Sequence, residues 1–229
     1  MVDDNQEEPT SVNVAEESLD KETLVKRISN EQVYLKKLVR ERSVDLVDAQ
    51  FEGFGSKRFC ICLGQSYEEM KEENIQVYNM YPEEMIDLCV VAIRREDSKV
   101  LGYLQMYFEG MLEKLNWSAF GCWGLLEEQL YYRCDPDEAY VSELAVIQEA
   151  RGKGIGTMLL NWAHEHAKHC GKNVITIQPV QGNPAKRLYE RLGYEVVERQ
   201  QGCCKSFIEN VFVFCGLEKM GLTHMQKRL

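Results

Sequence analysis

A glycine loop between a strand and a helix constrains this sequence more than any other feature. A strand-like stretch that ends near Ile147 is followed by "QEARGKGIG", and a helical pattern begins directly after it. Gly152, Gly154 and Gly156 occupy every second position of the loop. Free N–H groups and the dipole at a helix start favour an anion, and glycine lets the backbone approach it closely. The sequence therefore predicts an anion-binding site at this junction.

The spacing of the loop excludes two common phosphate-binding motifs. The nucleotide P-loop requires GxxxxGK[ST], which the chain lacks, and the dinucleotide loop requires a glycine where this chain has Thr157. The pattern that remains is Arg-x-x-Gly-x-Gly, from Arg151 to Gly156. Taken alone, this pattern is also consistent with a plain strand–helix turn that carries surface charges.

Patterns on both sides of the loop predict a single mixed α/β domain. Strands are expected at 23–29, 139–147, 173–180, 194–199 and 209–220, with a hairpin across 85–108. Helices are expected at 29–50, 67–80, 154–170 and 183–194. The last helix has Asn183 as its expected N-cap and Pro184 at its first position. The stretch 59–64 fits either a short strand or a turn.

The charge distribution separates an acidic tail from the rest of the chain. The net charge is −10, and residues 1–22 carry eight acids and one base, which leaves −3 for the other 207 residues. We expect residues 1–22 to form a disordered tail and 23–229 to form one domain. A mildly acidic domain gives no support to nucleic-acid binding.

Hydropathy and cysteine content bear on the compartment. No apolar run of 18 residues predicts a transmembrane helix, and the acidic N-terminus is unlike a secretory signal, so no membrane partner is expected. The nine cysteines are an odd number at irregular spacings. We interpret them as free thiols in a reducing compartment, the cytoplasm, with the nucleus as the alternative.

Two motifs in the second half of the chain resemble the GNAT superfamily of acetyl-CoA-dependent N-acetyltransferases. The first motif is "SELAVIQEARGKGIG", and the second, "NPAKRLYERLGY", follows it in the order that the family uses. The resemblance covers roughly 140–198, and the expected elements fit the family order across 23–229. It implies the GNAT fold, an α/β fold that has a mixed central sheet with a splayed strand pair and helices on both faces.

The resemblance also implies where acetyl-CoA binds. In that family the main chain of the strand before the loop pairs with the pantetheine arm, here Leu144, Ala145 and Val146. The loop holds the pyrophosphate, here Arg151, Gly152, Lys153, Gly154, Ile155, Gly156 and Thr157. Asn183 is expected beside the cofactor arm, with a plain helix cap as the alternative. Its spacing to the Leu188-Tyr189 pair is one residue shorter than is common in the family.

The implied reaction transfers an acetyl group from a thioester to an amine acceptor. Tyr189 matches the tyrosine that similar family members use as general acid for the departing thiolate, and a core tyrosine is the alternative. Most alkyl amines are protonated at neutral pH, so a general base is also needed. We favour Glu143 as this base, with a solvated edge glutamate as the alternative. The other candidates for the base are Glu83, Glu84, Asp87 and the 203–206 loop.

Three histidines follow the loop on the expected helix, but they do not predict a metal site. Only His166 and His169 share a helix face, and His164 lies away from them. We therefore expect no metal.

The segment 107–137 is long for a connection between two strands and unusually aromatic. It holds seven of the 22 aromatic residues: Tyr107, Phe108, Trp117, Phe120, Trp123, Tyr131 and Tyr132. Long connections of this kind are usually functional, so a lid over the acceptor pocket is one interpretation. A packed helix over the sheet or a homodimer contact is the other.

Three functions fit these observations. The first is an acetyl-CoA-dependent N-acetyltransferase that modifies a primary amine of a small molecule, such as a polyamine, an arylalkylamine or an amino acid, in a ternary complex. The second is a protein lysine or N-terminal acetyltransferase. The third is a regulatory module that binds acetyl-CoA without catalysis.

Overall fold

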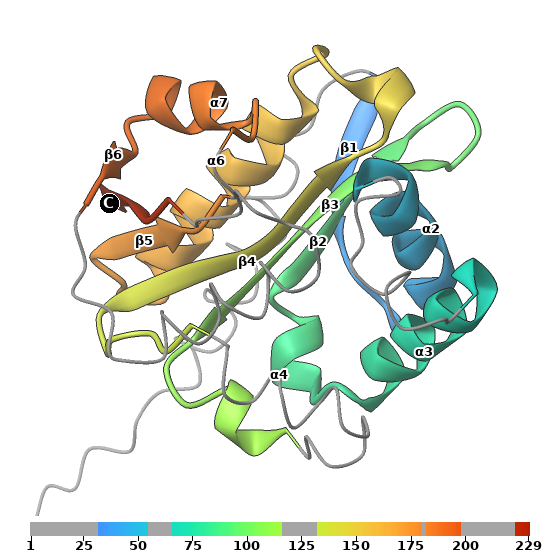
Figure 1. Cartoon of the computed structure of the whole chain (residues 1–229), viewed down its shortest axis with the longest axis horizontal. Helices are drawn as coiled ribbons and strands as arrows, with labels where there is room; N and C mark the ends of the chain where they lie inside the picture. Colours follow the sequence, from blue (N-terminus) through green and yellow to red (C-terminus); the bar gives the residue numbers. More distant parts are fainter. Residues whose placement is uncertain (1–31, 55–65, 116–131, 180–181, 198–222) are drawn as a thin grey trace, which may run out of the picture.

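The protein forms a seven-stranded mixed sheet with helices on both faces (Figure 1). The computed structural model describes residues 32–54, 66–115, 132–179, 182–197 and 223–229. The expected tail at 1–22, the expected strands at 23–29 and 209–220, the undecided stretch at 59–64, and 116–131 of the aromatic segment lie outside these residues.

The strands follow the order β1-β2-β3-β4-β5-β7-β6 across the sheet. They are β1 Val33–Lys37, β2 Cys89–Arg94, β3 Val100–Phe108, β4 Glu138–Val146, β5 Val174–Ile177, β6 Glu195–Val196 and β7 Met225–Arg228. Every neighbouring pair is antiparallel except β4 and β5, which are parallel. A parallel pair needs a crossover connection, and the helix after the glycine loop supplies it.

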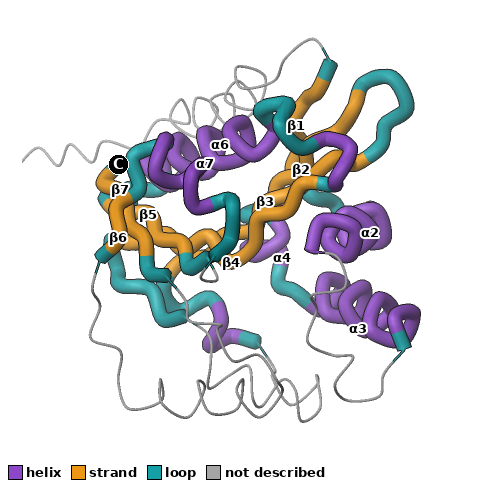
Figure 2. The backbone as a smooth tube through the Cα atoms, turned by 45° about the horizontal axis from the view of Figure 1, so that its top comes forward, coloured by secondary structure: helices purple, strands orange, loops and turns teal. Residues whose placement is uncertain are grey.

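The helices cover the sheet in two groups. They are η1 Arg40–Arg42, α2 Ser43–Phe54, α3 Tyr67–Met80, α4 Glu83–Ile86, η4 Leu112–Lys114, η6 Gln148–Ala150, α6 Ile155–His169 and α7 Lys186–Arg191. Helix α2 packs on β3 and β4 and against α3, whereas α6 packs on β2, β3 and β4. Figure 2 shows α2 and α3 on one side of these strands and α6 and α7 on the other.

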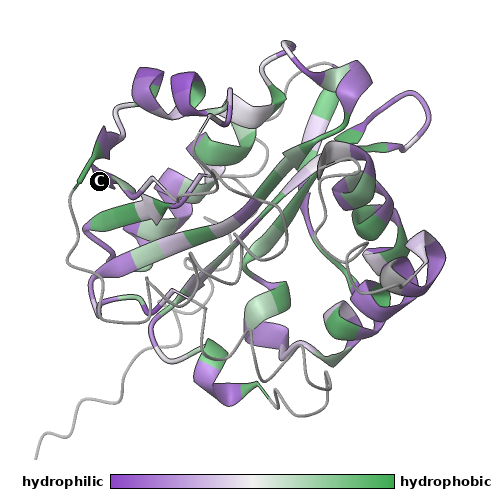
Figure 3. Cartoon of the chain, viewed as in Figure 1, coloured by the Kyte–Doolittle hydropathy of each residue, from purple (hydrophilic) through white to green (hydrophobic). Residues whose placement is uncertain are grey.

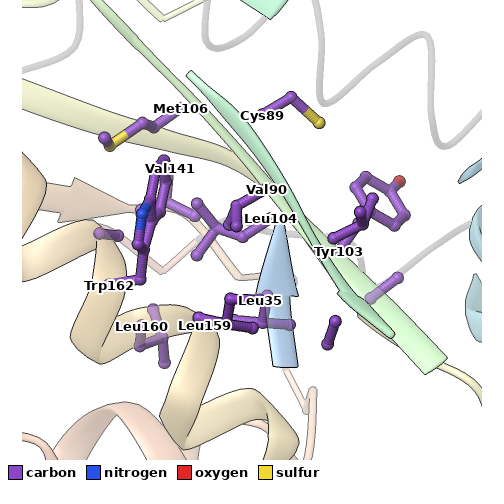
Figure 4. Close-up of a cluster of buried hydrophobic side chains, with 14 of the residues drawn as sticks. Leu35, Cys89, Val90, Tyr103, Leu104, Met106, Val141, Leu159, Leu160 and Trp162 are labelled. Carbon is purple, nitrogen blue, oxygen red and sulfur yellow. The ribbon is translucent and has the colours of Figure 1, made fainter. Parts of the chain in front are cut away.

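The main core lies between α6 and the central strands. Figure 4 shows Leu159 and Trp162 of α6 next to Leu35 and Val141, while Tyr103 points to the opposite side of the sheet. Strands β2 and β3 are buried along almost their whole length, as expected for strands covered on both faces. In Figure 3 apolar residues follow these strands, and the helices alternate apolar and polar stretches, as amphipathic helices do.

One expected helix is wrong, because residues 29–50 do not form a single helix. Val33–Lys37 is a strand that pairs with β2, and the helix begins only at Ser43. Val33 and Leu35 are buried while Lys36 is exposed, which is the two-residue period of a strand with one covered face. The spacing of the apolar residues in this stretch also fits the period of a helix, but pairing with the edge of β2 makes residues 33–37 a strand.

The other expected elements within the described residues are confirmed. The helices over 67–80 and 154–170, the hairpin of β2 and β3, and the strands over 139–147, 173–180 and 194–199 are all present, with ends shifted by a few residues. Helix α7 begins at Lys186, so Pro184 precedes the helix and does not occupy its first position. Strand β7 near the C-terminus was not expected.

Strands β4 and β5 separate after a short paired stretch. Their pairing runs from Glu138 with Val174 to Val141 with Ile177, and β4 then continues for five residues to Val146. Within the described sheet, residues 143–146 pair with β3, and none of the five pairs with β5. The strand edge that faces β5 is therefore unpaired there, as the expected splay of these two strands requires.

Candidate active site

A one-residue bulge in β4 decides which side of the sheet Glu143 faces. Gln105 pairs with Glu143 and the next residue of β3, Met106, pairs with Val141, so Ser142 is the extra residue. Alternate strand residues face opposite sides, and the extra residue therefore places Glu143 and Val141 on opposite faces. Val141 lies on the α6 side (Figure 4), so Glu143 faces α2 and α3.

The Glu143 carboxylate is fixed on that face by three hydrogen-bond donors. Gln50 Nε2 donates to Glu143 Oε2 at 2.6 Å, the Tyr78 hydroxyl donates at 3.2 Å, and the Tyr103 hydroxyl donates to the same oxygen. Burial, and secondly the negative charge of Glu143, raise the pKa of Tyr78 and of the Cys89 thiol well above their ordinary values. The carboxylate is thus half-buried and held in one position.

Sequence reasoning did not identify these donors. Gln50 lies four residues after Leu46 and three after Val47 on the buried side of α2, so a polar residue within an apolar stripe was a usable signal. Tyr78 and Tyr103 carried no such signal, because tyrosines in a helix and a strand are ordinary core residues.

The other candidate bases that the structure describes lie in surface ion pairs. Asp87 pairs with Lys37 at 3.1 Å, and the Asp87 side chain is 67% exposed. Glu83 pairs with Arg40, and Glu84 with Lys114, each at 2.7 Å, with 77% and 60% exposure of the two glutamate side chains. The loop 203–206 lies outside the described residues. Of the described candidates, Glu143 is the one on β4, directly before the segment 144–146 that is expected to pair with the cofactor.

The glycine loop has the backbone geometry of an anion site. Gly152 and Gly154 have φ of 74° and 82°, in the left-handed region where glycine is favoured. A Cβ at either residue would meet no atom within 4 Å, so the backbone conformation requires glycine there, and packing does not. Gly154 is the N-cap of α6 and provides no side-chain cap for the first-turn N–H groups. These N–H groups are therefore available to a bound anion.

The third glycine of the loop has a packing role. A Cβ on Gly156 would come within 3.0 Å of Leu188 Cδ2 on α7 and 4.0 Å of Val146 Cγ2 on β4. The absence of a side chain at Gly156 lets α7 approach the start of α6. Exposed Lys153 and half-buried Thr157 complete the loop and first turn that were expected to hold the pyrophosphate.

The Arg151 side chain bonds to main-chain carbonyls on both sides of the loop. Its Nε donates to Val146 O at 3.1 Å and its Nη2 donates to Gly53 O at 2.5 Å. The guanidinium thus joins the end of β4 to the end of α2.

The strand segment expected to pair with the pantetheine arm lies on the unpaired edge of β4. Ala145 is buried, and Leu144 and Val146 are half-buried. Asn183 lies before α7, and its Oδ1 accepts a hydrogen bond from the Ala185 N–H at 2.9 Å. The expected N-cap role of Asn183 is therefore wrong, because the N-cap of α7 is Ala185 and the Asn183 side chain bonds instead within the turn that precedes the helix.

Tyr189 lies on α7 with its ring buried. The residue is 4% exposed, and burial raises the pKa of its hydroxyl to about 12. The hydroxyl therefore carries its proton at physiological pH.

A chain of hydrogen bonds from Lys227 through His164 to Tyr194 ends beside the Tyr189 ring. The Tyr189 ring meets the Tyr194 ring edge-on at 5.9 Å, and the Tyr194 hydroxyl lies 3.0 Å from His164 Nε2. Lys227 Nζ lies 3.3 Å from His164 Nδ1, and an ammonium can only donate. His164 Nε2 therefore carries the imidazole proton and donates to Tyr194. Burial, and secondly the nearby Lys227, lower the pKa of His164 to about 4, so its imidazole is neutral.

The remaining histidines on α6 have structural surroundings. His166 stacks on Trp162 at 4.9 Å, and His169 is exposed at the end of the helix. Within the described ranges no group of three or more His, Cys, Asp or Glu residues could hold a metal ion. None of the helices in those ranges is long and apolar enough to span a membrane.

The returning end of the aromatic segment is fixed to the sheet by Glu138. This buried carboxylate accepts hydrogen bonds from the Tyr132 hydroxyl at 2.8 and 2.9 Å, and from the Asp135 N–H at 3.1 Å. It also accepts bonds from Thr176 of β5 and Gln226 of β7. The segment therefore rejoins the sheet at a fixed place.

That place lies on the same face as Glu143. Tyr132 stacks on Tyr140 with the ring centroids 4.5 Å apart and the planes at 20°. Tyr140 precedes Val141 in β4 and faces the opposite side, which is the side that Glu143 faces after the bulge. The aromatic segment thus contributes to the α2–α3 face of the sheet.

Comparison with known proteins identifies the family. The model of the GNAT acetyltransferase family matches residues 60–194, more than half of the chain. An uncharacterised N-acetyltransferase of Methanocaldococcus jannaschii is 38% identical over 65 residues, which cover 28% of this chain and 29% of that protein. The match thus spans less than a third of the relative's own length.

Solved structures share the fold at low sequence identity. A crystal structure of an acetyltransferase aligns with a TM-score of 0.58 at 19% identity, over 85% of this chain and 98% of that chain. The NatC complex bound to Gag peptide and CoA gives 0.55 at 15% identity, over 86% and 99%. The PaiA N-acetyltransferase of Thermoplasma acidophilum in complex with coenzyme A gives 0.50 at 16% identity, over 86% and 99%. With the matched motifs and the described sheet, the family model establishes that this chain belongs to the GNAT acetyltransferase family, whose members use acetyl-CoA as acetyl donor.

Proposed function

We propose that the chain transfers an acetyl group from acetyl-CoA to the primary amine of a small molecule, by direct transfer in a ternary complex. Residues 23–229 would form the catalytic domain, and residues 1–22 would lie outside it as a tail. The observation that carries this proposal is the unpaired edge of β4 at residues 142–146, which leads directly into the glycine loop at the start of α6.

The described residues fit acetyl-CoA along this edge. The main chain of Leu144 to Val146 lies on the edge of β4 that β5 leaves uncovered, and it can pair there with the amides of the pantetheine arm, as an added strand does. The backbone of residues 151–157 then offers N–H groups at a helix start to the pyrophosphate. Asn183 lies at the turn before α7, from which its side chain can contact the cofactor arm.

The proposed chemistry divides between two sides of the sheet. Glu143 takes one proton from the alkyl ammonium, which leaves the nitrogen lone pair free to attack the thioester carbon. A C–N bond forms and the C–S bond breaks. Tyr189 gives its proton to the departing thiolate and is protonated again by the second proton that the nitrogen loses. The products are the N-acetyl amine and coenzyme A with a free thiol, and one proton is released through Glu143.

The aromatic segment supports a small acceptor over a protein acceptor. Tyr132 and Tyr140 stack on the face where Glu143 lies, so the returning end of the segment covers part of that side. A peptide would need an open groove there, whereas a small amine would not.

A thiol-release assay tests the function. The purified chain and acetyl-CoA are combined with spermidine, 2-phenylethylamine, glycine and lysine-containing peptides, and an acceptor-free blank corrects for the protein's own thiols. We expect turnover with one class of small amine. Tyr189→Phe should lower kcat by about 100-fold and leave the affinity for coenzyme A unchanged in a calorimetric titration. Tyr67→Phe, at an exposed tyrosine, is the matched control.

Other outcomes identify the alternatives. Turnover with peptides alone would favour a protein acetyltransferase. Binding of coenzyme A without turnover of any acceptor would favour the non-catalytic module. An unchanged kcat in Tyr189→Phe would remove Tyr189 as the general acid.

A further inference from the structure

The buried side-chain amide of Gln50 has a hydrogen-bond partner for its nitrogen but none for its oxygen. The residue is 1% exposed, and its Nε2 donates to Glu143 Oε2 at 2.6 Å. Its Oε1 is buried and has no hydrogen-bond partner, which holds for no other side-chain polar atom of the described chain. The amide cannot turn over to relieve this, because Oε1 would then face the carboxylate oxygen and the two would repel.

A buried carbonyl oxygen without a hydrogen-bond partner destabilises the folded state, and such atoms are rare in folded proteins. The unpaired oxygen of Gln50 therefore needs an explanation, and a function is one. The same polar cluster shows the usual arrangement. Gln105, which is 3% exposed, has its Oε1 3.4 Å from the Tyr78 hydroxyl, which can give its one proton either to this oxygen or to Glu143. Gln50 therefore differs from its neighbour in having an acceptor atom that the protein itself leaves unpaired.

The position of Gln50 points to the reacting centre. Three residues further along α2, a Cβ on Gly53 would come within 2.8 Å of Ala145 Cβ, so this helix lies directly on the cofactor segment of β4. Gln50 is thus located against β4 beside Glu143, directly before the segment of this strand that is proposed to hold the thioester arm. An N–H donor brought by a substrate to Glu143 would also lie close to Gln50.

We propose that Gln50 Oε1 accepts a hydrogen bond from the acceptor nitrogen while Glu143 removes its proton, which makes Gln50 a catalytic residue. This inference rests on the proposed function. A primary ammonium has three N–H groups: one proton goes to Glu143, one goes by way of Tyr189 to the thiolate, and the third stays on the product amide and keeps its bond to Gln50. An N-methyl amine ends as a tertiary amide without N–H and loses that bond. Gln50 therefore selects primary amines.

Binding and turnover are measured separately to test this. Spermidine, 2-phenylethylamine and glycine are each titrated calorimetrically into the chain saturated with coenzyme A, and their N-methyl analogues are titrated in parallel. Gln50→Leu should weaken binding of the primary amine by at least about tenfold. In the thiol-release assay the wild type should prefer the primary amine over its N-methyl analogue in kcat/KM, and Gln50→Leu should abolish this preference. The affinity for coenzyme A should stay unchanged. Gln105→Leu, at the paired glutamine, should keep both the affinity and the preference.

A purely structural role for Gln50 predicts a different pattern. Gln50→Leu would then unfold at lower urea concentration and bind the amine as the wild type does, which would overturn the inference and leave the proposed function intact. If Gln50→Leu does not fold, Gln50→Met, which is closer in shape, replaces it.

Failure of the proposed function would look different. Wild-type binding of an amine without thiol release, lost in Gln50→Leu, would support the Gln50 site and contradict the enzyme. A wild type that binds none of the probes would overturn both.

Discussion

Replacing His164 should make the protein less sensitive to acid. The imidazole is held neutral between Tyr194 and Lys227, and its pKa is lowered from 6.5 to about 4. In the unfolded chain His164 binds a proton below about pH 6.5, whereas in the folded protein it does so only near pH 4. Between these values the unfolded state binds more protons, so the free energy of unfolding falls as the pH falls. Between about pH 7 and pH 4.5 this single group should remove about 2 kcal/mol.

Urea unfolding of the wild type and of His164→Gln at these two pH values measures that contribution. The Gln side chain can still donate to Tyr194 and accept from Lys227, but it does not titrate. Carboxylates that titrate in the same range contribute equally to both proteins and cancel in the double difference. His169→Gln, at an exposed position on the same helix, should behave as the wild type. An equal loss of stability in the wild type and in His164→Gln would refute the neutral, buried imidazole.

The remaining predictions concern the active site directly. Gly154→Asp should abolish binding of coenzyme A in calorimetry, because a carboxylate enters the phosphate loop. Gly110→Asp, at an open position with φ of 72°, should have similar backbone strain and unchanged binding. Glu143→Gln should lower kcat by about 100-fold or more and change the KM for acetyl-CoA little, because the glutamine cannot take the proton. Glu84→Gln, at the surface ion pair, should keep the wild-type kcat. Equal kcat in the two glutamine variants would remove Glu143 as the base.

Local signals predicted most of the fold. The hairpin turn at 95–99, the capped helix at 67–80 and the glycine loop each depend on residues that are close in sequence, so their patterns were sufficient. The stretch after residue 29 was misinterpreted because Val33 and Leu35 fit a helical stripe until β2 is present to pair with them. Strand β7 has the polar sequence "MQKR", and its pairing with β5 and β6 is what makes it a strand.

The residues of the candidate site likewise divide into those that local sequence predicted and those that it did not. Residues that act through the backbone, such as those of the glycine loop, were predictable because their conformation is local. The donors to Glu143 were not, because Gln50, Tyr78 and Tyr103 lie 93, 65 and 40 residues away from it along the chain. Packing of α2 and α3 on the sheet brings them together, and no spacing in the sequence records that. The side of the sheet that Glu143 faces also depended on the bulge at Ser142, which simple alternation along a strand does not reveal.

The bulge has a consequence for comparing relatives of this protein. Two neighbouring strands cross the same span of sheet with unequal numbers of residues, so the side on which the Glu143 carboxylate emerges depends on whether Ser142 is bulged or paired. If Ser142 paired regularly with β3 after Val141, the next residue, Glu143, would face α6 without any change in its chemical type. An aligned glutamate in a relative whose strand keeps the same number of residues but has no bulge would thus lie on the opposite side of the sheet. Assigning a base by alignment in this family therefore requires counting the residues of both strands.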